Sequence, residues 1–495
     1  MDRWIKSTSV SSPSARSTAA TAAWRAFGFI SSGTTTRVCS RSSIIPMLVG
    51  DMVFQTVLSR RILPVQRPPR HPMIDYLWVA FDASESYDAA EIISECSMIQ
   101  RFRPLFPHPS RFLLIPIVLV LVMTACSTNP VTGKRELFIV SPQHELQIGE
   151  QEFLPNQQSQ GGLYRADPAL GEYVNAVGQR LAAVSDSLLP YEFVVLNNDT
   201  PNAWALPGGK IAINRGLLLQ LRNEAELAAV LGHEIVHAAA RHYARAMSRA
   251  SALELGANIL IDLAIYEEWQ DTDLLQQGKR TALFAFNQRY SREAEIQSDE
   301  YGIRYMVRAG YDPRAAVSLQ STFVDMVRQS EPSFEALFAS HPPSLERYER
   351  NQRTVQDYAP GGRIGEQAFL EATAYVRSTA PAYSLMQRAI QYAAVDEHQK
   401  SVSTIQEALR IVPKEPRFHG TLGMLLYNQQ EYRAAIGAYS EAIALDSGYY
   451  EYFLGRGLAY GNLERFGSAE ADLRRSQELF NTQLAADALT AISER

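Results

Sequence analysis

The spacing of apolar residues predicts an α+β domain from about residue 166 and an all-α region after residue 380. One helix is indicated where apolar side chains recur every three or four positions: Tyr173, Val174, Val177, Leu181 and Val184. Residues 191–196 are an apolar run typical of a strand, and a second short strand is expected at 210–214. Helical spacing then resumes at Leu227, Val230, Leu231 and Ile235. Asn223 followed by Glu226 is a capping-box start for this last helix.

Two histidines in this last helix, His233 and His237, lie four residues apart and therefore on one face, about 5–6 Å from each other. Both imidazoles can bind one ion. Glu234 lies on the adjoining face, where its carboxylate can act as a general base on a water at that ion. The H-E-x-x-H pattern is that of zinc peptidases, so the sequence predicts a metal site. A chance match is a poor alternative, because the 495 residues include only nine histidines.

A Gly-Gly turn precedes the strand expected at 210–214 and suggests an edge strand beside the metal helix. Unpaired backbone groups on a sheet edge can align an extended peptide. We expect the substrate edge to consist of Asn202, Ala203, Trp204, Gly208 and Gly209. An ordinary structural hairpin is the alternative.

The third metal ligand must come from elsewhere in the chain. His242 lies five residues after His237, about 140° further round a continuous helix, so we expect it to point away as a surface or packing histidine. Glu295 is the better candidate. Asp299 lies four residues later on the same helix face and can accept the N–H of a ligating histidine from outside the ligand set. Glu293 is the rival carboxylate.

The C-terminal region has a period of 34 residues. Small residues recur at this spacing: Gly423 and Gly457, Ala435 and Ala469, Ala408 and Ala442. In TPR repeats such residues lie where paired helices touch. We expect a TPR domain at 380–495, with units near 382–415, 416–449 and 450–483 and one final helix. A generic helical bundle is the alternative.

Composition restricts the possible functions. The net charge of −6, with 20% charged residues, gives no basic bias that would indicate nucleic-acid binding. The three cysteines, Cys39, Cys96 and Cys126, are too few for a disulfide framework. A length of 495 residues fits two or three domains.

The N-terminal segments are expected to lie outside the folded domains. Residues 1–97 are rich in Ser, Thr, Ala and Arg at their start, and we interpret them as a mis-assigned or disordered extension. An organellar transit peptide is the alternative. Residues 98–125 have the basic start and apolar core of a secretory signal, with small residues before Cys126 as in a bacterial lipobox. An uncleaved membrane anchor is the alternative.

Lipid on Cys126 would anchor the protein at a membrane without spanning it, with residues 126–165 as a tether. By the usual bacterial sorting rule, Ser127 after the cysteine favours the outer membrane. The most apolar later stretch, at 253–266, carries Glu254 and Asp262 and is too short to span a membrane.

Five segments together resemble the zinc peptidases related to the HtpX heat-shock protease and the CAAX prenyl endopeptidase. The resemblance is closer to the periplasmic, TPR-bearing BepA-type members of that group. The segments are residues 202–209, 233–237, 295–302, 310–313 and 340–343. The resemblance implies an α+β zincin-type metallopeptidase domain at 166–360, followed by an all-α TPR solenoid. It also implies one zinc ion held by His233, His237 and Glu295, with Glu234 as the base.

The resemblance further places His341, in Ser340-His341-Pro342-Pro343, near the metal. His341 could be a regulatory fourth ligand or could stabilise the oxyanion during catalysis. A structural histidine before two prolines is the alternative.

These features predict a zinc-dependent endopeptidase of the bacterial cell envelope, anchored to the outer membrane through Cys126 or soluble in the periplasm. The resemblance implies that its substrates are misfolded or stalled outer-membrane proteins. The TPR domain would then bind such substrates or the outer-membrane protein assembly machinery. The competing hypothesis is a TPR-based chaperone or assembly factor whose zinc site is latent or regulatory.

Overall fold

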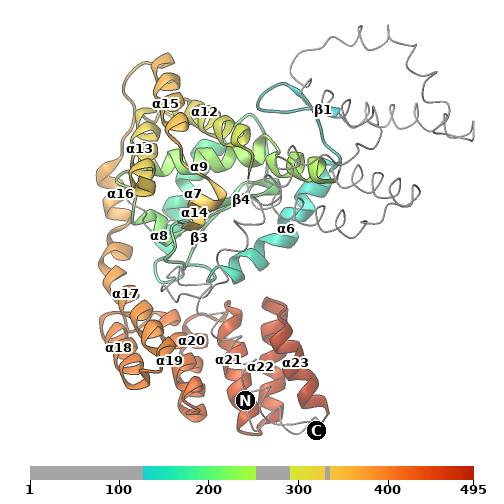
Figure 1. Cartoon of the computed structure of the whole chain (residues 1–495), viewed down its shortest axis with the longest axis vertical. Coiled ribbons are helices and arrows are strands. Elements are labelled where there is room, and N and C mark those ends of the chain that lie inside the picture. The colour runs from blue at the N-terminus through green and yellow to red at the C-terminus, as the bar shows by residue number, and fades with distance from the viewer. Residues whose placement is uncertain (1–125, 252–289, 329–334, 495) are drawn as a thin grey trace, which may run out of the picture. The chain divides into compact units, whose positions relative to one another are not determined.

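The computed structural model describes residues 126–251, 290–328 and 335–494 (Figure 1). The expected extension at 1–97, the signal sequence at 98–125 and the apolar stretch at 253–266 lie outside the described residues. Within the part of the chain that is described, no helix has the length and apolar character needed to cross a membrane.

A three-stranded sheet lies next to the helix that carries His233 and His237. Its strand order is β3 (Glu192–Leu196), β5 (Lys210–Asn214), β4 (Ala203–Leu206). β3 is parallel to β5, and β4 is antiparallel to it. The strand at 210–214 is therefore central, with all five residues buried, and β4 before the turn is the edge strand. The sequence analysis expected the strand at 210–214 to be the edge strand. That expectation was wrong because the parallel pairing of β5 with β3 is a long-range contact, which local spacing does not reveal.

The turn between β4 and β5 is the 3₁₀ segment η4 (Pro207–Gly209), in which Gly208 and Gly209 have φ of 79° and 86°. Both glycines are buried, so this half of the expected substrate edge is covered. Helix α6 (Pro142–Ser159) covers Gly208, and its Gly149 lies so close to the turn that an added Cβ would be 2.0 Å from the Pro207 carbonyl oxygen. Gly209 lies against Leu189 and Tyr191. Of the expected substrate edge, Ala203 and Trp204 remain on edge strand β4.

Helix α9 (Glu224–Ala239) is the centre of the domain, and every one of its residues is buried. It lies among α7 (Pro168–Ala182), α12 (Arg292–Arg308), α13 (Arg314–Arg328) and α16 (Glu366–Ala372), as Figure 1 shows. Its start follows the predicted capping signal, because the Asn223 side chain accepts a hydrogen bond from the Glu226 N–H at 2.9 Å. The Glu226 carboxylate in turn accepts from the Arg222 N–H.

Residues 126–165 are folded onto this domain, where a tether was expected. β1 (Cys126–Thr128) pairs with β2 (Arg135–Leu137), and α6 follows. The buried positions of α6 are Glu145, Gly149, Phe153, Gln157 and Gln158, of which only Phe153 is a large apolar residue. Such a face has little apolar periodicity, which is why the sequence did not indicate a packed helix.

The C-terminal region consists of helix pairs with the predicted 34-residue period. The helices are α17 (Ala374–Ala394), α18 (His398–Ile411), α19 (Pro416–Asn428), α20 (Tyr432–Leu445), α21 (Tyr450–Asn462), α22 (Phe466–Leu479) and α23 (Gln483–Ser493). Gly423 faces the ring of Tyr439, and 34 residues later Gly457 faces Leu473. The predicted fold class, an α+β domain followed by an all-α TPR-like region, is confirmed.

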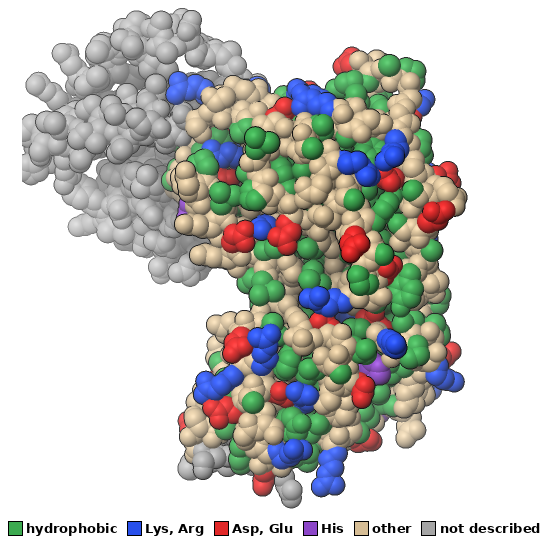
Figure 2. Space-filling view, turned by 180° about the vertical axis from the view of Figure 1, so that it is seen from behind, with side chains coloured by type: hydrophobic (Ala, Val, Ile, Leu, Met, Phe, Trp, Pro, Cys, Tyr) green, Lys and Arg blue, Asp and Glu red, His purple; other side chains and the backbone are tan. Residues whose placement is uncertain are grey.

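Polar contacts join the helix pairs to the segment that follows β3. Asn197, directly after β3, donates to the Glu415 carboxylate at 2.9 Å, and the Gln387 amide donates to Asp199 at 2.8 Å. On the face shown in Figure 2, acidic and basic side chains are interspersed over the described surface, with apolar side chains between them.

Candidate metal centre

Helix α9 places the two histidines of the H-E-x-x-H motif on one face, as their spacing predicted. The Nε2 atoms of His233 and His237 lie 3.0 Å apart, and both residues are buried. Two ring nitrogens at this distance need either a proton or a cation between them, because two lone pairs would repel each other.

Glu295 on α12 joins this pair. Its Oε1 lies 3.3 Å from His237 Nε2, and its Oε2 lies 3.5 Å from His233 Nε2. The rival Glu293 has a side chain that is 53% exposed and lies near Arg245 and Arg249, at 3.9 and 3.8 Å. The structure therefore brings Glu295, and not Glu293, to the two histidines.

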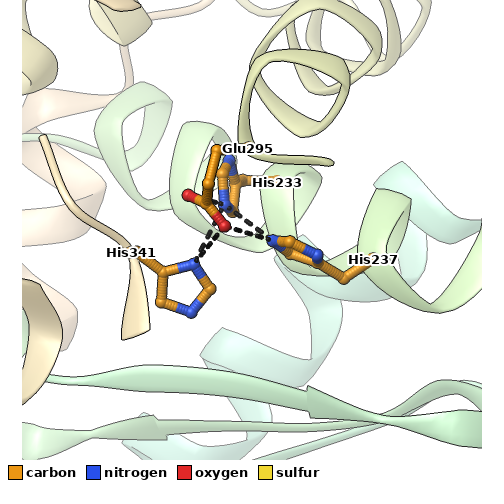
Figure 3. Close-up of side chains that lie close together, drawn as sticks. All are labelled: His233, His237, Glu295 and His341. Carbon is orange, nitrogen blue, oxygen red and sulfur yellow. Dashed lines mark hydrogen bonds and ion pairs between the residues drawn. The ribbon is translucent and has the colours of Figure 1, made fainter. Parts of the chain in front are cut away.

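His341 completes the group. It follows α14 (Glu335–Ser340), and its Nδ1 lies 3.3 Å from His233 Nε2 and 3.2 Å from Glu295 Oε1. Figure 3 shows the four side chains pointing toward one another from three separate segments. The other ring nitrogen of His341, Nε2, lies 3.7 Å from the Glu234 carboxylate.

The geometry of these donors fits one divalent cation. One nitrogen or oxygen from each of His233, His237, Glu295 and His341 lies within 4.8 Å of the others. A tetrahedral ion with bonds of about 2.0–2.1 Å separates its ligand atoms by about 3.3 Å. The closest contacts of His233 with His237 and His341, and of Glu295 with each of the three histidines, are 3.0 to 3.5 Å and thus near this value.

The buried guanidinium of Arg347 contacts both Asp299 and Glu295. Arg347, on α15 (Leu345–Thr354), donates to both oxygens of Asp299 at 2.7 Å and lies 2.9 Å from Glu295 Oε2. Asp299 lies 2.9 Å from Nδ1 of His233, as expected for a carboxylate that orients a ligating histidine. Although burial acts in the opposite direction, Arg347 and His233 hold the pKa of Asp299 below its usual range.

The pKa values of the two histidines are shifted in opposite directions. Burial alone would lower the pKa of His233, but Glu295 and Asp299 raise it to about 10. Burial lowers the pKa of His237 well below its usual range. Burial also raises the pKa of Glu234, which suits a group that must accept a proton near neutral pH.

A small cavity adjoins Glu234 and His233. Its volume is about 60 Å³, which is room for a few water molecules. Its walls are mostly apolar and include Ala203 of the edge strand: Ala203, Leu217, Ala229, Val230, Ile303, Met306, Leu319 and Phe323. The cavity therefore leaves space beside the general base and next to the expected substrate strand.

The structure corrects the expectation for His242, which is buried and contacts His237. Helix α9 ends at Ala239, and Arg241 has φ of 58°, so the chain turns and does not continue the helical rotation assumed from the spacing. His242 Nδ1 consequently lies 3.0 Å from His237 Nδ1. Burial lowers the pKa of His242 to about 3.

Sequence reasoning missed two further residues at this site. Arg347 gave no signal, because a charged residue in a polar helix is normally exposed. Tyr290 stacks on the His237 ring with centroids 3.9 Å apart, and its hydroxyl lies 3.4 Å from the Ala205 carbonyl oxygen of the edge strand. Its position directly before the predicted helix of Glu295 was the only available hint.

The fold and the site define a metallopeptidase domain, and comparison with known proteins agrees. Residues 168–355 match the model of Peptidase family M48. The matched segment contains all four residues of the candidate metal group. The family resemblance that the motifs predicted is confirmed.

Among the relatives of this domain are proteins named beta-barrel assembly-enhancing protease. The protein of Escherichia coli (strain K12) is 35% identical over 184 residues, which cover 36% of this chain and 37% of that protein. The protein of Yersinia pestis is 31% identical over 214 residues, covering 42% and 43%. The mitochondrial metalloendopeptidase OMA1 of Schizosaccharomyces pombe is 31% identical over 194 residues, covering 39% and 54%. The matched region thus spans about two fifths to one half of these relatives.

Solved TPR structures are among the chains similar to part of this protein. One is the first TPR of Spaghetti (RPAP3) bound to an HSP90 peptide. It is 20% identical, covers 23% of this chain and 93% of that chain, and has a TM-score of 0.23.

Proposed function

We propose that this protein is a zinc-dependent endopeptidase. The observation that carries the proposal is the convergence of His233, His237 and Glu295 on one point, with the Glu234 carboxylate beside it. Two imidazoles and a carboxylate are a donor set that zinc prefers. When bound, the zinc ion would polarise the scissile carbonyl and lower the pKa of the attacking water.

The side chains of the protein supply the proton transfer. Glu234 accepts a proton from the attacking water as the new C–O bond forms, and it then passes this proton to the nitrogen of the leaving amine as the C–N bond breaks. The outer side of edge strand β4, which pairs with no other strand of the described residues, would align the substrate backbone. Asp299 would keep His233 oriented toward the metal.

The proposed cellular role is quality control of outer-membrane proteins in the cell envelope. The shared domain with relatives named beta-barrel assembly-enhancing protease supports this substrate class. The signal-like segment at 98–125 supports export, and lipid on Cys126 would anchor the protein to the outer membrane. The helix pairs would bind unfolded substrate or the assembly machinery.

A second candidate function, a chaperone or assembly factor with a latent metal site, is favoured by His341. Its Nδ1 lies within the donor group, where it would act as a fourth ligand and cover the site. His341 is 7% exposed, so substrate entry would require it to move.

The test is Glu234→Gln in an assay that cleaves an unfolded β-barrel membrane protein, with and without a zinc chelator. Cleavage should disappear in the variant and in the chelated wild type. The fold should persist, since Glu234 Oε2 has no hydrogen-bond partner among the described residues and burial disfavours its charged form. Glu300→Gln, an exposed position on α12, is the matched control. Undiminished cleavage by Glu234→Gln would refute the proposed mechanism.

A further inference from the structure

Among the described residues, no carboxylate faces Nδ1 of His237, whereas Asp299 faces Nδ1 of His233. Nδ1 of His233, the ring nitrogen that points away from the ligand group, lies 2.9 Å from the Asp299 carboxylate. The corresponding Nδ1 of His237 lies 3.0 Å from Nδ1 of another imidazole, that of His242. Both rings of this second pair are 1% exposed, so no bulk water competes for the contact.

A chain of hydrogen bonds continues from His242 to the surface. His242 Nε2 lies 3.1 Å from Gln297 Oε1, and Gln297 Nε2 donates to Glu293 Oε1 at 3.2 Å. Glu293, whose side chain is 53% exposed, is the surface end of the chain. Ser298 Oγ, also buried, lies at a longer 3.5 Å from His242 Nδ1.

The carboxylate end of this chain determines the direction of every hydrogen bond in it. An ionised carboxylate only accepts, so Glu293 fixes the Gln297 amide with its NH₂ outward and its carbonyl toward His242. The Gln297 carbonyl must then receive the N–H of His242 Nε2, which leaves a lone pair on His242 Nδ1. That lone pair accepts the N–H of His237 Nδ1, so the lone pair of His237 lies on Nε2.

We propose that His242 is a positioning residue for metal binding, which with Gln297 holds His237 in the tautomer whose Nε2 lone pair faces the ligand group. This inference rests on the proposed binding of a metal at His237. The left-handed turn at Arg241 makes it possible, because that turn brings His242 back to the end of α9. Outer partners of this kind typically change metal affinity by about 10- to 100-fold.

The test measures Zn²⁺ affinity of the purified full chain by competition with a chromophoric chelator. His242→Leu, which removes the acceptor, should weaken Zn²⁺ binding by about 10- to 100-fold. His242→Asn, whose Oδ1 can stand in for Nδ1, should restore most of the affinity. The visible spectrum of the Co²⁺-loaded protein should change in the Leu variant and stay close to wild type in the Asn variant. His398→Leu, an exposed position at the start of α18, is the control.

Equal affinity of His242→Leu and wild type would overturn the inference, and so would an equal loss in the Leu and Asn variants, which would indicate packing alone. If His242→Leu does not fold, Gln297→Met replaces it. That variant leaves the His242 tautomer free and should weaken Zn²⁺ binding by about tenfold; unchanged binding would refute the positioning role. A wild-type protein that binds no Zn²⁺ would instead refute the proposed function.

Discussion

Arg347 should be among the residues on which the stability of the domain depends most. Its side chain is 7% exposed and faces two buried carboxylates, those of Asp299 and Glu295, at 2.7 to 2.9 Å. It also donates to the Pro342 carbonyl oxygen at 3.1 Å, which fixes the segment after His341. Arg347→Met keeps much of the aliphatic volume but leaves both carboxylates without their shared cation.

Leaving a buried charge unpaired costs about 3–5 kcal/mol, so Arg347→Met should lower the free energy of unfolding by that amount at pH 7. The expected fall in melting temperature is on the order of 10 °C. Asp299→Asn in the same background should recover part of the loss, with a coupling energy of about 1–3 kcal/mol. Arg350→Met is the matched control. Its side chain is 49% exposed and pairs with Glu346 at 3.3 Å, so it should cost about 0–1 kcal/mol.

The difference between wild type and Arg347→Met should depend on pH in one direction. The pKa of Asp299 is lowered in the folded wild type, so the ion pair stabilises the protein above the unfolded pKa of about 4. This contribution is lost as pH falls through the lower folded pKa. The difference in unfolding free energy between wild type and Arg347→Met should therefore narrow below about pH 4 when both proteins have been freed of metal by a chelator. A difference under about 1 kcal/mol at pH 7, or a difference that widens in acid, would refute the buried ion-pair argument.

Two further predictions concern the helices that carry the ligands. Glu295→Ala should lower zinc content sharply, whereas Glu293→Ala should weaken zinc binding by no more than the roughly tenfold expected for Gln297→Met, because Glu293 reaches His237 only through Gln297 and His242; elemental analysis of the purified variants decides between them. Gly302→Ala should lower the free energy of unfolding by about 1–3 kcal/mol, since the new Cβ would lie 3.0 Å from the backbone nitrogen of His233. Gly171→Ala on α7 should be neutral or stabilising, because no described atom outside its own stretch of helix lies within 4 Å of the added Cβ. Equal effects at the two glycines would contradict this reasoning.

The part of the candidate ligand group that lies on helices α9 and α12 could be predicted, because it depends on local helical geometry. His233 and His237 are one turn apart on α9, and Glu295 and Asp299 are one turn apart on α12, so spacing alone determined which side chains share a face. The pairing of the two helices follows from a close crossing, where Gly302 lies against the backbone of α9. That contact is long-range and is not visible in either segment alone.

The position of His242 could not be predicted from spacing, because the chain leaves the helix at a residue that is not glycine. Arg241 adopts φ of 58°, which arginine rarely does. Tertiary contacts hold it there: its guanidinium donates to Glu145 at 2.7 Å and to the Val140 carbonyl oxygen at 2.8 Å, and it lies over the Phe138 ring. Residues expected to form a tether thus fix the turn that brings His242 to His237.

The charges around the ligand group explain why a divalent cation fits it. Glu234 and Glu295 are buried carboxylates, the Asp299 carboxylate is 9% exposed, and Arg347 is a buried guanidinium; together they carry a net charge of −2 when all four are ionised. Two shifts oppose this charge: Glu295 and Asp299 raise the pKa of His233 to about 10, and burial raises the pKa of Glu234. Each shift favours uptake of one proton, and two protons neutralise the group. One divalent cation would supply the same two charges, leave His233 free to ligate and leave Glu234 ionised as the base.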